Sequence, residues 1–538
     1  MSSKADDTAV LGDTKPGAFA PFGYRAFALL WTATLISNVG TWMHDVGAGW
    51  LMTNLSPSPA IVALVQTATT APIFLFALFA GALADRVDKR KFLLLINVIL
   101  TAVIALMAVL VASDSITPLG LLAFTFLIGT GAAFMAPAWQ AIVPSLVPRS
   151  HLQPAIALNS MGINLARAIG PALAGFLIAA VSVATPFFAN AVSHLVIIAA
   201  LLLWKPSPAP DRKLPPEPLM GSIVTGLRHA SHNGPLKATL LRSFGFFIFA
   251  SAYWALLPLV ARGLDGGGAE VYGLLLAAIG TGAVAGALLL PMMRAYVDVN
   301  RLVAGGTIVT AAAMILLGLT TSPMIAIPAA FVGGLGWITV LTSLNVSAQT
   351  SLPNWVRARG LSVALMVFFG CMAVGSAGWG QLAAATSTGM TLMIAAIGVV
   401  IAIPLTWRAT LGQGEALDLT PAMSWADPIV AEDASATLDR GPVLVTIRYE
   451  IEDQQGFLEA IHALSSERYR DGAYDWGVYQ DAATPNVWIE WFFVSSWAEH
   501  LRQHERATMA DIDLHEAVRG YHTGSEDPRV DHMLAATR

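Results

Sequence analysis

The chain has 538 residues, of which 55% are hydrophobic and only 12% are charged, and its formal net charge is −5. Soluble domains carry about 25% charged residues, so this composition predicts a membrane protein. The negative net charge argues against a nucleic-acid partner. The single cysteine, Cys371, excludes an internal disulfide and a cysteine–zinc site.

Twelve apolar stretches are long enough to cross a bilayer, which takes about 20 residues of helix. They cover residues 26–52, 59–84, 91–112, 117–140, 153–180, 184–204, 237–261, 271–293, 301–320, 323–348, 357–384 and 388–408. Of the 21 Lys and Arg among residues 1–410, 19 fall on the side of the membrane that holds the N-terminus. Because cationic loops stay in the cytoplasm, we expect both chain ends there.

A charged loop joins the second and third stretches. From Gly81 to Lys91 it holds four cations and two carboxylates, too much charge for the bilayer core. Its pattern, G-x-L-x-D-R-x-x-[KR]-[RK], resembles the signature loop of the major facilitator superfamily. The resemblance implies that Asp85 contacts the start of the eleventh stretch and latches this side of the protein shut. The gating residues are then Gly81, Asp85, Arg86, Arg90, Arg357 and Arg359.

The fifth stretch contains Gly170-Pro171-x-x-x-Gly175, which resembles the Gly-Pro motif of antiporter branches. Pro171 removes a helix hydrogen bond, and the glycines allow close helix approach, so we expect a joint at which two bundles rock. Ala166 and Ala174 stand where the family form would have glycine, which weakens the antiporter inference but not the mechanical one. Ordinary helix packing is the alternative.

Changes in composition divide the chain. Residues 205–236 are rich in proline and predict a linker between two six-helix halves, which share Gln140-x-x-x-Pro144 and Gln349-x-x-x-Pro353 as a faint repeat. The parts are an N-terminal tail at 1–25, bundles at 26–204 and 237–408, the linker at 205–236, a connector at 409–440 and a soluble domain at 441–538.

The soluble domain alternates strand and helix patterns. Residues 443–449, 474–479 and 487–494 have β character, and 454–468 have helical spacing. Asp481–Asn486 is a hairpin turn, and Ser495 or Ser496 caps the next helix. The order βαββα predicts a ferredoxin-like α+β domain. It resembles the small dimeric barrels of antibiotic-biosynthesis monooxygenases, so we expect a homodimer through this domain.

Several segments together resemble one branch of the superfamily, the transmembrane secretion effectors related to the enterobactin exporter. These segments are Ser37-Asn38-Val-Gly40-Thr-Trp42-Met43, Pro137-Ala138-Trp-Gln140, Ala166-Arg167-x-x-Gly170-Pro171-Ala172 and the run from Trp497 to Thr508. The resemblance implies export of small molecules, siderophore-like or lipophilic, across a bacterial inner membrane by alternating access and proton antiport. Import is the alternative direction. The expected partners are a small-molecule substrate, protons and membrane lipids.

Five polar residues within the spans are candidates for the translocation path: Asp45, Arg167, Asn38, Asn164 and His194. Asp45 is the candidate proton carrier, with a solvated structural role as the alternative. His44 points about 100° away from it on a helix. Arg167 stays charged, so it needs an anion or a carbonyl: one interpretation pairs it with Asp45, and another with an anionic substrate. A structural arginine is the third.

The soluble domain offers weaker signals. His500 and His504, four residues apart, share a helix face as metal ligands can, but spacing fixes no third ligand. We favour an ordinary polar helix surface, and expect no metal, no cofactor and no catalytic residue. Trp476, Tyr479, Trp488 and Trp491 line a pocket if the domain modifies cargo, but a dimerisation or regulatory role is favoured over catalysis. The chain has no Walker motif, so ATP is not expected to drive it.

Overall fold

The computed structural model describes residues 17, 19–84, 87–205, 219–420, 422, 438 and 440–536. It confirms twelve apolar helices long enough to cross a membrane. These are α1 (Arg25–Leu55), α2 (Pro59–Ala84), α3 (Lys89–Ala112), α4 (Pro118–Ile142), α5 (Leu152–Ala180), α6 (Thr185–Leu203), α8 (Gly234–Gly263), α9 (Ala269–Arg294), α10 (Val299–Leu319), α11 (Pro323–Thr350), α12 (Arg357–Ala385) and α13 (Thr388–Thr406).

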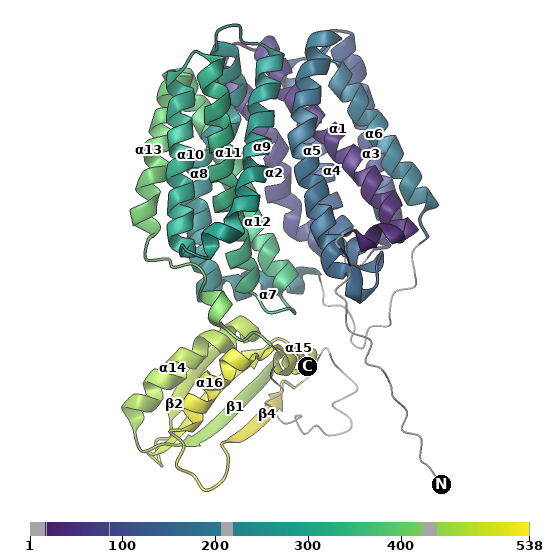
Figure 1. Ribbon diagram of the computed structural model, residues 1–538. Coiled ribbons are helices and arrows are strands. Elements are labelled where there is room, and N and C mark those ends of the chain that lie inside the picture. Colours follow the sequence, from purple (N-terminus) through teal and green to yellow (C-terminus); the bar gives the residue numbers. More distant parts are fainter. Residues whose placement is uncertain are drawn as a thin grey trace, which may run out of the picture.

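The spans form two halves, α1–α6 and α8–α13, which stand side by side (Figure 1). They meet along two helix pairs, α2 with α12 and α5 with α9. Along the first pair, Thr67 donates a hydrogen bond to the Ala373 carbonyl at 2.9 Å. Gly380 lies against Ala60 and Ala63, where a side chain would collide. Small residues at these points bring helices of different halves into backbone contact.

The region between the halves differs from the expected linker, because it contains an additional helix, α7 (Leu219–His232). Its next residue, Asn233, caps α8 by accepting a hydrogen bond from the Leu236 amide at 2.9 Å. Gly226 of α7 packs on the Cβ of Arg359 at the start of α12. The sequence did not predict this amphipathic helix, because the prolines that precede it are typical of a linker.

The soluble domain is a four-stranded antiparallel sheet with helices on one face (Figure 1). The strands lie in the order β2-β3-β1-β4, the ferredoxin-like arrangement that the βαββ pattern predicts. The sequence missed the last strand, because 529–534 mixes charged and apolar residues. The elements are β1 (Val443–Glu450), α14 (Gln454–Asp471), β2 (Asp475–Gln480), β3 (Val487–Val494), α15 (Trp497–Arg506), α16 (Met509–Arg519) and β4 (Arg529–Leu534).

Alternation along the strands builds the core of this domain. Every second residue of β1 is buried against α14, whose Phe457, Ile461 and Leu464 have no exposed surface. The predicted turn is confirmed, since Asp481 accepts hydrogen bonds from the amides of Ala483 and Thr484. Ser496, one of the two expected caps, accepts a hydrogen bond from the Glu499 amide at the start of α15.

Candidate transport site and its links to the soluble domain

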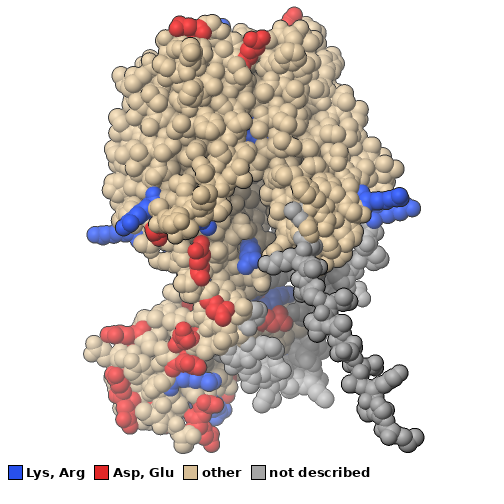
Figure 2. Space-filling view, in the orientation of Figure 1, with Lys and Arg blue, Asp and Glu red and all other residues tan. Residues whose placement is uncertain are grey.

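The two ends of the spans differ in charge. We call the ends next to the soluble domain the domain side, and the opposite ends the far side. The Lys and Arg side chains of the spans lie mainly on the domain side, and the acidic side chains lie mainly on the far side (Figure 2). Between the halves the surface recedes on the domain side (Figure 2). The charge pattern matches the asymmetry used to predict the topology.

Asp45 lies on the face of α1 that turns toward the second half. One helical turn further on, a Cβ on Gly49 would lie 2.8 Å from the Tyr272 hydroxyl of α9. Trp50 also stacks on the Tyr272 ring, with centroids 6.3 Å apart. Asp45 is half-buried and forms no hydrogen bond or ion pair with any residue that the structure describes. Its carboxyl is therefore a half-buried titratable group between the halves, and no cation of the described chain pairs with it.

The two histidines near Asp45 in this bundle point elsewhere. His44 packs edge-on against Phe187 of α6, with ring centroids 5.0 Å apart. His194 Nδ1 lies 3.0 Å from Asn97 Oδ1, which links α6 to α3. Both rings thus lie inside the first half, and the 100° offset between neighbours on a helix places His44 and Asp45 on different faces, as expected.

Arg167 of α5 lies over the ring of Trp42, with its Cζ 5.4 Å from the centroid. The structure shows no ion pair between Arg167 and Asp45, both of which it describes. Arg167 Nε is buried without a hydrogen-bond partner among the described residues. In this conformation the guanidinium is therefore held by an aromatic face, and one of its donors is unused.

The Gly-Pro motif lies where the halves touch on the far side. A Cβ on Gly273 of α9 would lie 2.8 Å from the Pro171 carbonyl oxygen and 2.9 Å from the Gly175 Cα. Gly170 faces its own half instead, because a Cβ there would lie 2.6 Å from the Trp42 Cβ. Pro171 and Gly175 thus form a contact between halves with no room for a side chain.

The gating residues on the domain side are only partly described. Asp85 and Arg86 lie outside the described residues, so the predicted latch is not seen. Gly81 faces Ser362 near the start of α12, with 3.8 Å between a Cβ on Gly81 and the Ser362 Oγ. Arg357 donates to the Leu352 carbonyl at 3.3 Å. Arg359 is the residue on which α7 packs.

Arg90 does not bridge the two halves. Its guanidinium donates to the carbonyls of Leu201 and Leu202, each at 2.7 Å, at the end of α6. A cation at a helix C-terminus satisfies free carbonyls and complements the helix dipole. Arg90 therefore ties α3 to α6 within the first half.

The remaining polar candidates are half-buried. Asn164 donates to the Ser160 carbonyl of its own helix at 2.9 Å, and no hydrogen bond of Asn38 is seen within the described chain. Sequence reasoning missed Trp42 and Tyr272, the aromatic partners of Arg167 and of α1. Their signal is weak, because an aromatic residue in a span is ordinarily a lipid or core contact.

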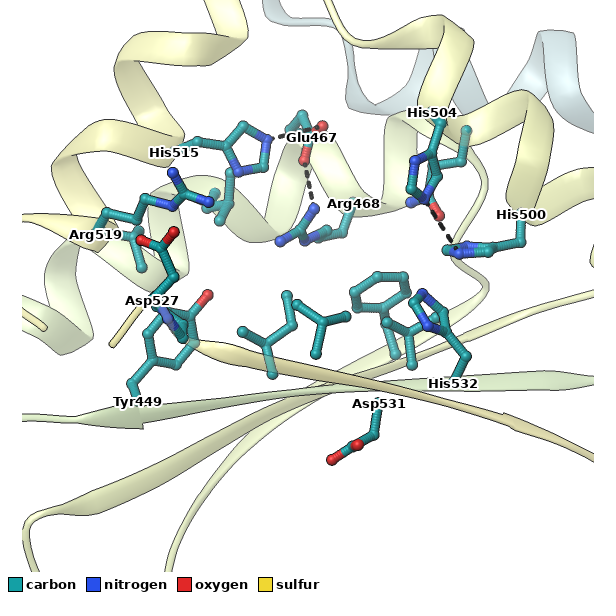
Figure 3. A pocket seen from close by; sticks show the side chains of 18 of the residues that line it. Tyr449, Glu467, Arg468, His500, His504, His515, Arg519, Asp527, Asp531 and His532 are labelled. Atoms are coloured by element: carbon teal, nitrogen blue, oxygen red, sulfur yellow. Dashed lines mark hydrogen bonds and ion pairs between the residues drawn. The ribbon is translucent and has the colours of Figure 1, made fainter. Parts of the chain in front are cut away.

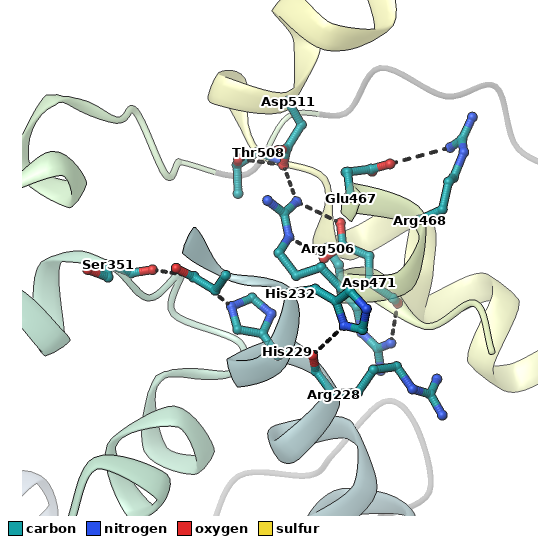
Figure 4. A network of polar contacts seen from close by, with 12 residues as sticks. Arg228, His229, His232, Ser351, Glu467, Arg468, Asp471, Arg506, Thr508 and Asp511 are labelled. Carbon is teal, nitrogen blue, oxygen red and sulfur yellow. Dashed lines mark hydrogen bonds and ion pairs between the residues drawn. The ribbon is translucent and has the colours of Figure 1, made fainter. Parts of the chain in front are cut away.

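The soluble domain docks on the domain side of the second half (Figure 4). Arg228 of α7 donates to the Gly472 carbonyl at 2.7 Å, and His232 stacks on Tyr469 with centroids 5.2 Å apart. Arg506 of α15 lies 4.5 Å from the ring centroid of Trp355, in the turn between α11 and α12. Sequence patterns gave no hint of this junction, because its members are far apart in the chain.

The soluble domain also holds a cavity of about 680 Å³ between its sheet and helices (Figure 3). The side chain of Arg468, which is 1% exposed, lies in the middle of this cavity. Its Nε forms an ion pair with Glu490 Oε1 at 2.9 Å. Burial opposes the charge of Glu490, but the Arg468 guanidinium outweighs this and lowers the pKa of Glu490. Tyr449 donates to the same carboxylate at 3.1 Å. The four strand aromatics expected as pocket residues do not line this cavity.

Two joined six-helix halves with polar residues held between them define a membrane transporter. Solved transporters share the fold. A bacterial homologue of the human lysosomal transporter Spinster aligns with a TM-score of 0.59 at 15% identity, covering 72% of this chain and 97% of that one. The nucleoside transporter NupG aligns with a TM-score of 0.56 at 11% identity, covering 71% and 98%.

The family model for transmembrane secretion effectors matches residues 16–538, so the chain belongs to this family of the major facilitator superfamily. The enterobactin exporter EntS of Escherichia coli O1:K1 is 28% identical over 395 residues, covering 71% of this chain and 92% of that protein. The staphyloferrin A transporter of Staphylococcus aureus NCTC 8325 is 27% identical over 273 residues, covering 48% of this chain and 65% of that protein. The predicted family, fold and multi-pass membrane character are confirmed.

Proposed function

We propose that the protein exports anionic small molecules, siderophores or related compounds, from the cytoplasm across a bacterial inner membrane. The observation that carries the proposal is the similarity to the enterobactin exporter, which extends over 92% of that protein. The soluble domain and both chain ends then lie in the cytoplasm, in keeping with the cations on the domain side.

Two features at opposite ends of the molecule support alternating access. On the far side, Pro171 and Gly175 touch Gly273 without intervening side chains. On the domain side the halves separate at the surface (Figure 2). A rocking motion that releases the α5–α9 contact and closes the domain side exposes the space near Arg167 to each side in turn.

Arg167 is the proposed anchor for the substrate. Its Nε is a buried donor without a partner among the described residues, and no carboxylate of the described chain pairs with it. A buried cation without a counter-ion is costly, so an anionic group on the substrate would satisfy it. This favours the anionic-substrate interpretation over a pair with Asp45, and leaves Asp45 to carry protons.

Transport into inverted membrane vesicles tests the proposal. With an imposed proton gradient, vesicles containing the protein should accumulate a siderophore from a panel that includes enterobactin, staphyloferrin A and a lipophilic cation. An uncoupler should abolish the accumulation, and Arg167→Gln should weaken uptake of the anionic compounds only. Uptake confined to right-side-out vesicles would instead identify an importer.

A further inference from the structure

Three histidines of the soluble domain converge at one end of its cavity (Figure 3). His500 and His504 lie on one face of α15, and His532 lies on the inner face of β4. The ring of His500 is 4.7 Å from each of the other two rings, centroid to centroid. One ring nitrogen of each histidine lies within 4.8 Å of the others. The sequence placed only the first two together, because His532 is on a strand that it did not predict.

Their spacing suits a metal ion. In a tetrahedral zinc site the metal–nitrogen distance is about 2.0–2.1 Å, which puts two ligand nitrogens about 3.3 Å apart. The Nε2 atoms of His500 and His504 are 3.2 Å apart. The ligand nitrogens of all three histidines lie within 4.8 Å of one another, so the His532 ring would move inward by up to about 1.5 Å to complete the set. Three imidazoles from one helix and one strand form the ligand set in which Zn²⁺ keeps an open fourth position.

The histidine cluster is not an ordinary polar patch on the surface of the domain. His500 is 2% exposed, which corrects the expectation of a polar helix surface. Its Nδ1 is buried without a hydrogen bond to any residue in the described part of the chain. Trp497 packs on both His500 and His532, with centroids 5.3 and 5.9 Å away, and closes one side. The cavity borders the cluster on the other side.

The positive charge of Arg468 is paired, so it would not repel a cation bound by the three histidines. Arg468 also faces the cavity, but its guanidinium is paired with Glu490 at 2.9 Å. Asp531 points to the opposite face of β4 (Figure 3) and so is not a ligand. Imidazole nitrogens suit Zn²⁺, Cu²⁺, Ni²⁺ and Fe²⁺, whereas Mg²⁺ and Ca²⁺ need oxygen ligands.

We propose that His500, His504 and His532 bind one divalent transition-metal ion, Zn²⁺ or a close relative, with one coordination position open to the cavity. A water molecule or an anionic oxygen or nitrogen donor would occupy that position. The site goes beyond the proposed transport function, and it reverses the expectation that the chain holds no metal.

Zn²⁺ binding to the full-length protein tests this. The protein is purified in detergent without a polyhistidine tag, treated with a chelator, and titrated with Zn²⁺ in competition with a chromophoric chelator. We expect one tightly held equivalent, and at least about tenfold weaker binding in His504→Ala and in His532→Ala. The matched controls His462→Ala and His515→Ala, in the same domain, should bind like the wild type.

X-ray absorption of the zinc-loaded wild-type protein gives a second readout that needs no variant, and so stands even if a substitution prevents folding. Three imidazole nitrogens and one further oxygen or nitrogen donor, all at about 2.0–2.2 Å from the metal, are expected. Absence of a tight equivalent in the wild type, equal losses in His462→Ala and His532→Ala, or a zinc spectrum with fewer than three imidazoles would each overturn the proposal.

Discussion

The guanidinium of Arg506 in the soluble domain lies over the ring of Trp355, between α11 and α12, with 4.5 Å from its Cζ to the ring centroid. Arg506 is 2% exposed, and it also donates to Glu499 Oε1 at 2.5 Å and to the Asp471 carbonyl at 2.6 Å. Trp355 precedes α12, the helix that packs along α2 of the other half. The soluble domain therefore touches an element that has to move if the halves rock.

Removing the Trp355 ring should loosen the soluble domain. A cation–π contact contributes about 0.5–2 kcal/mol depending on burial, so Trp355→Ala should shift the docking equilibrium by about 2- to 30-fold. Hydrogen exchange in α7 and in residues 469–472 should accelerate. Arg529→Ala, at an exposed site on β4, is the matched control. Unchanged protection of α7 in Trp355→Ala would show that this contact does not hold the domain.

Gly273→Ala should block transport, because the added Cβ would meet the Pro171 carbonyl at 2.8 Å and hold the far side apart. We expect loss of uptake in inverted vesicles and faster hydrogen exchange in the adjoining turns of α5 and α9. Gly305→Ala in α10, where a Cβ has nothing within 4 Å, should transport normally. Normal transport by Gly273→Ala would mean that the α5–α9 contact is not part of the cycle.

Asp45→Asn should abolish gradient-driven accumulation but retain substrate binding. A carboxyl can take a proton from one side and release it to the other, and an amide cannot. The measurement is uptake with and without a proton gradient, together with equilibrium binding of substrate at several pH values. His194→Ala is the informative comparison. Because a hydrogen bond between His194 and Asn97 links α6 to α3, that variant should be less stable but should still couple transport to the proton gradient. The reverse result would move proton coupling to α6.

Docking of the soluble domain should weaken at acidic pH. Burial, with Arg470 and Arg506 nearby, lowers the pKa of His229 on α7 to about 3. In a solvated state the ordinary value is about 6.5, so the undocked state binds more protons between these values. Docking is then strongest above about pH 6.5 and weakens as the pH falls toward about 3. Hydrogen exchange in α14, corrected for its intrinsic pH dependence, measures this, and His229→Gln should flatten the profile.

The outer face of the soluble sheet should mediate a dimer. Tyr479, 64% exposed, stacks on Trp491 with centroids 6.1 Å apart, and Tyr474 stacks on Phe493 at 5.9 Å. Exposed aromatic patches of this kind mark protein interfaces. Mass photometry of the full-length protein should find a dimer that Tyr479→Asp converts to monomer and Tyr479→Phe leaves intact. A monomeric wild-type protein would contradict the expected homodimer.

The sequence by itself determined the twelve spans and, in the soluble domain, the first three strands with the helices α14 and α15. Both depend on local periodicity: about 20 apolar residues for a span, and alternation along each strand. It also determined that His44 and Asp45 face different ways, since that follows from the pitch of one helix.

Tertiary structure decided which distant residues meet. Trp42 rather than Asp45 lies beside Arg167, Gly273 lies against the Gly-Pro motif, and Arg90 reaches the end of α6 instead of the other half. His532 joins His500 and His504 only because β4 pairs with β1 at the edge of the sheet. Spacing along a chain fixes neighbours within a helix or strand, but contacts between elements depend on how their faces pack.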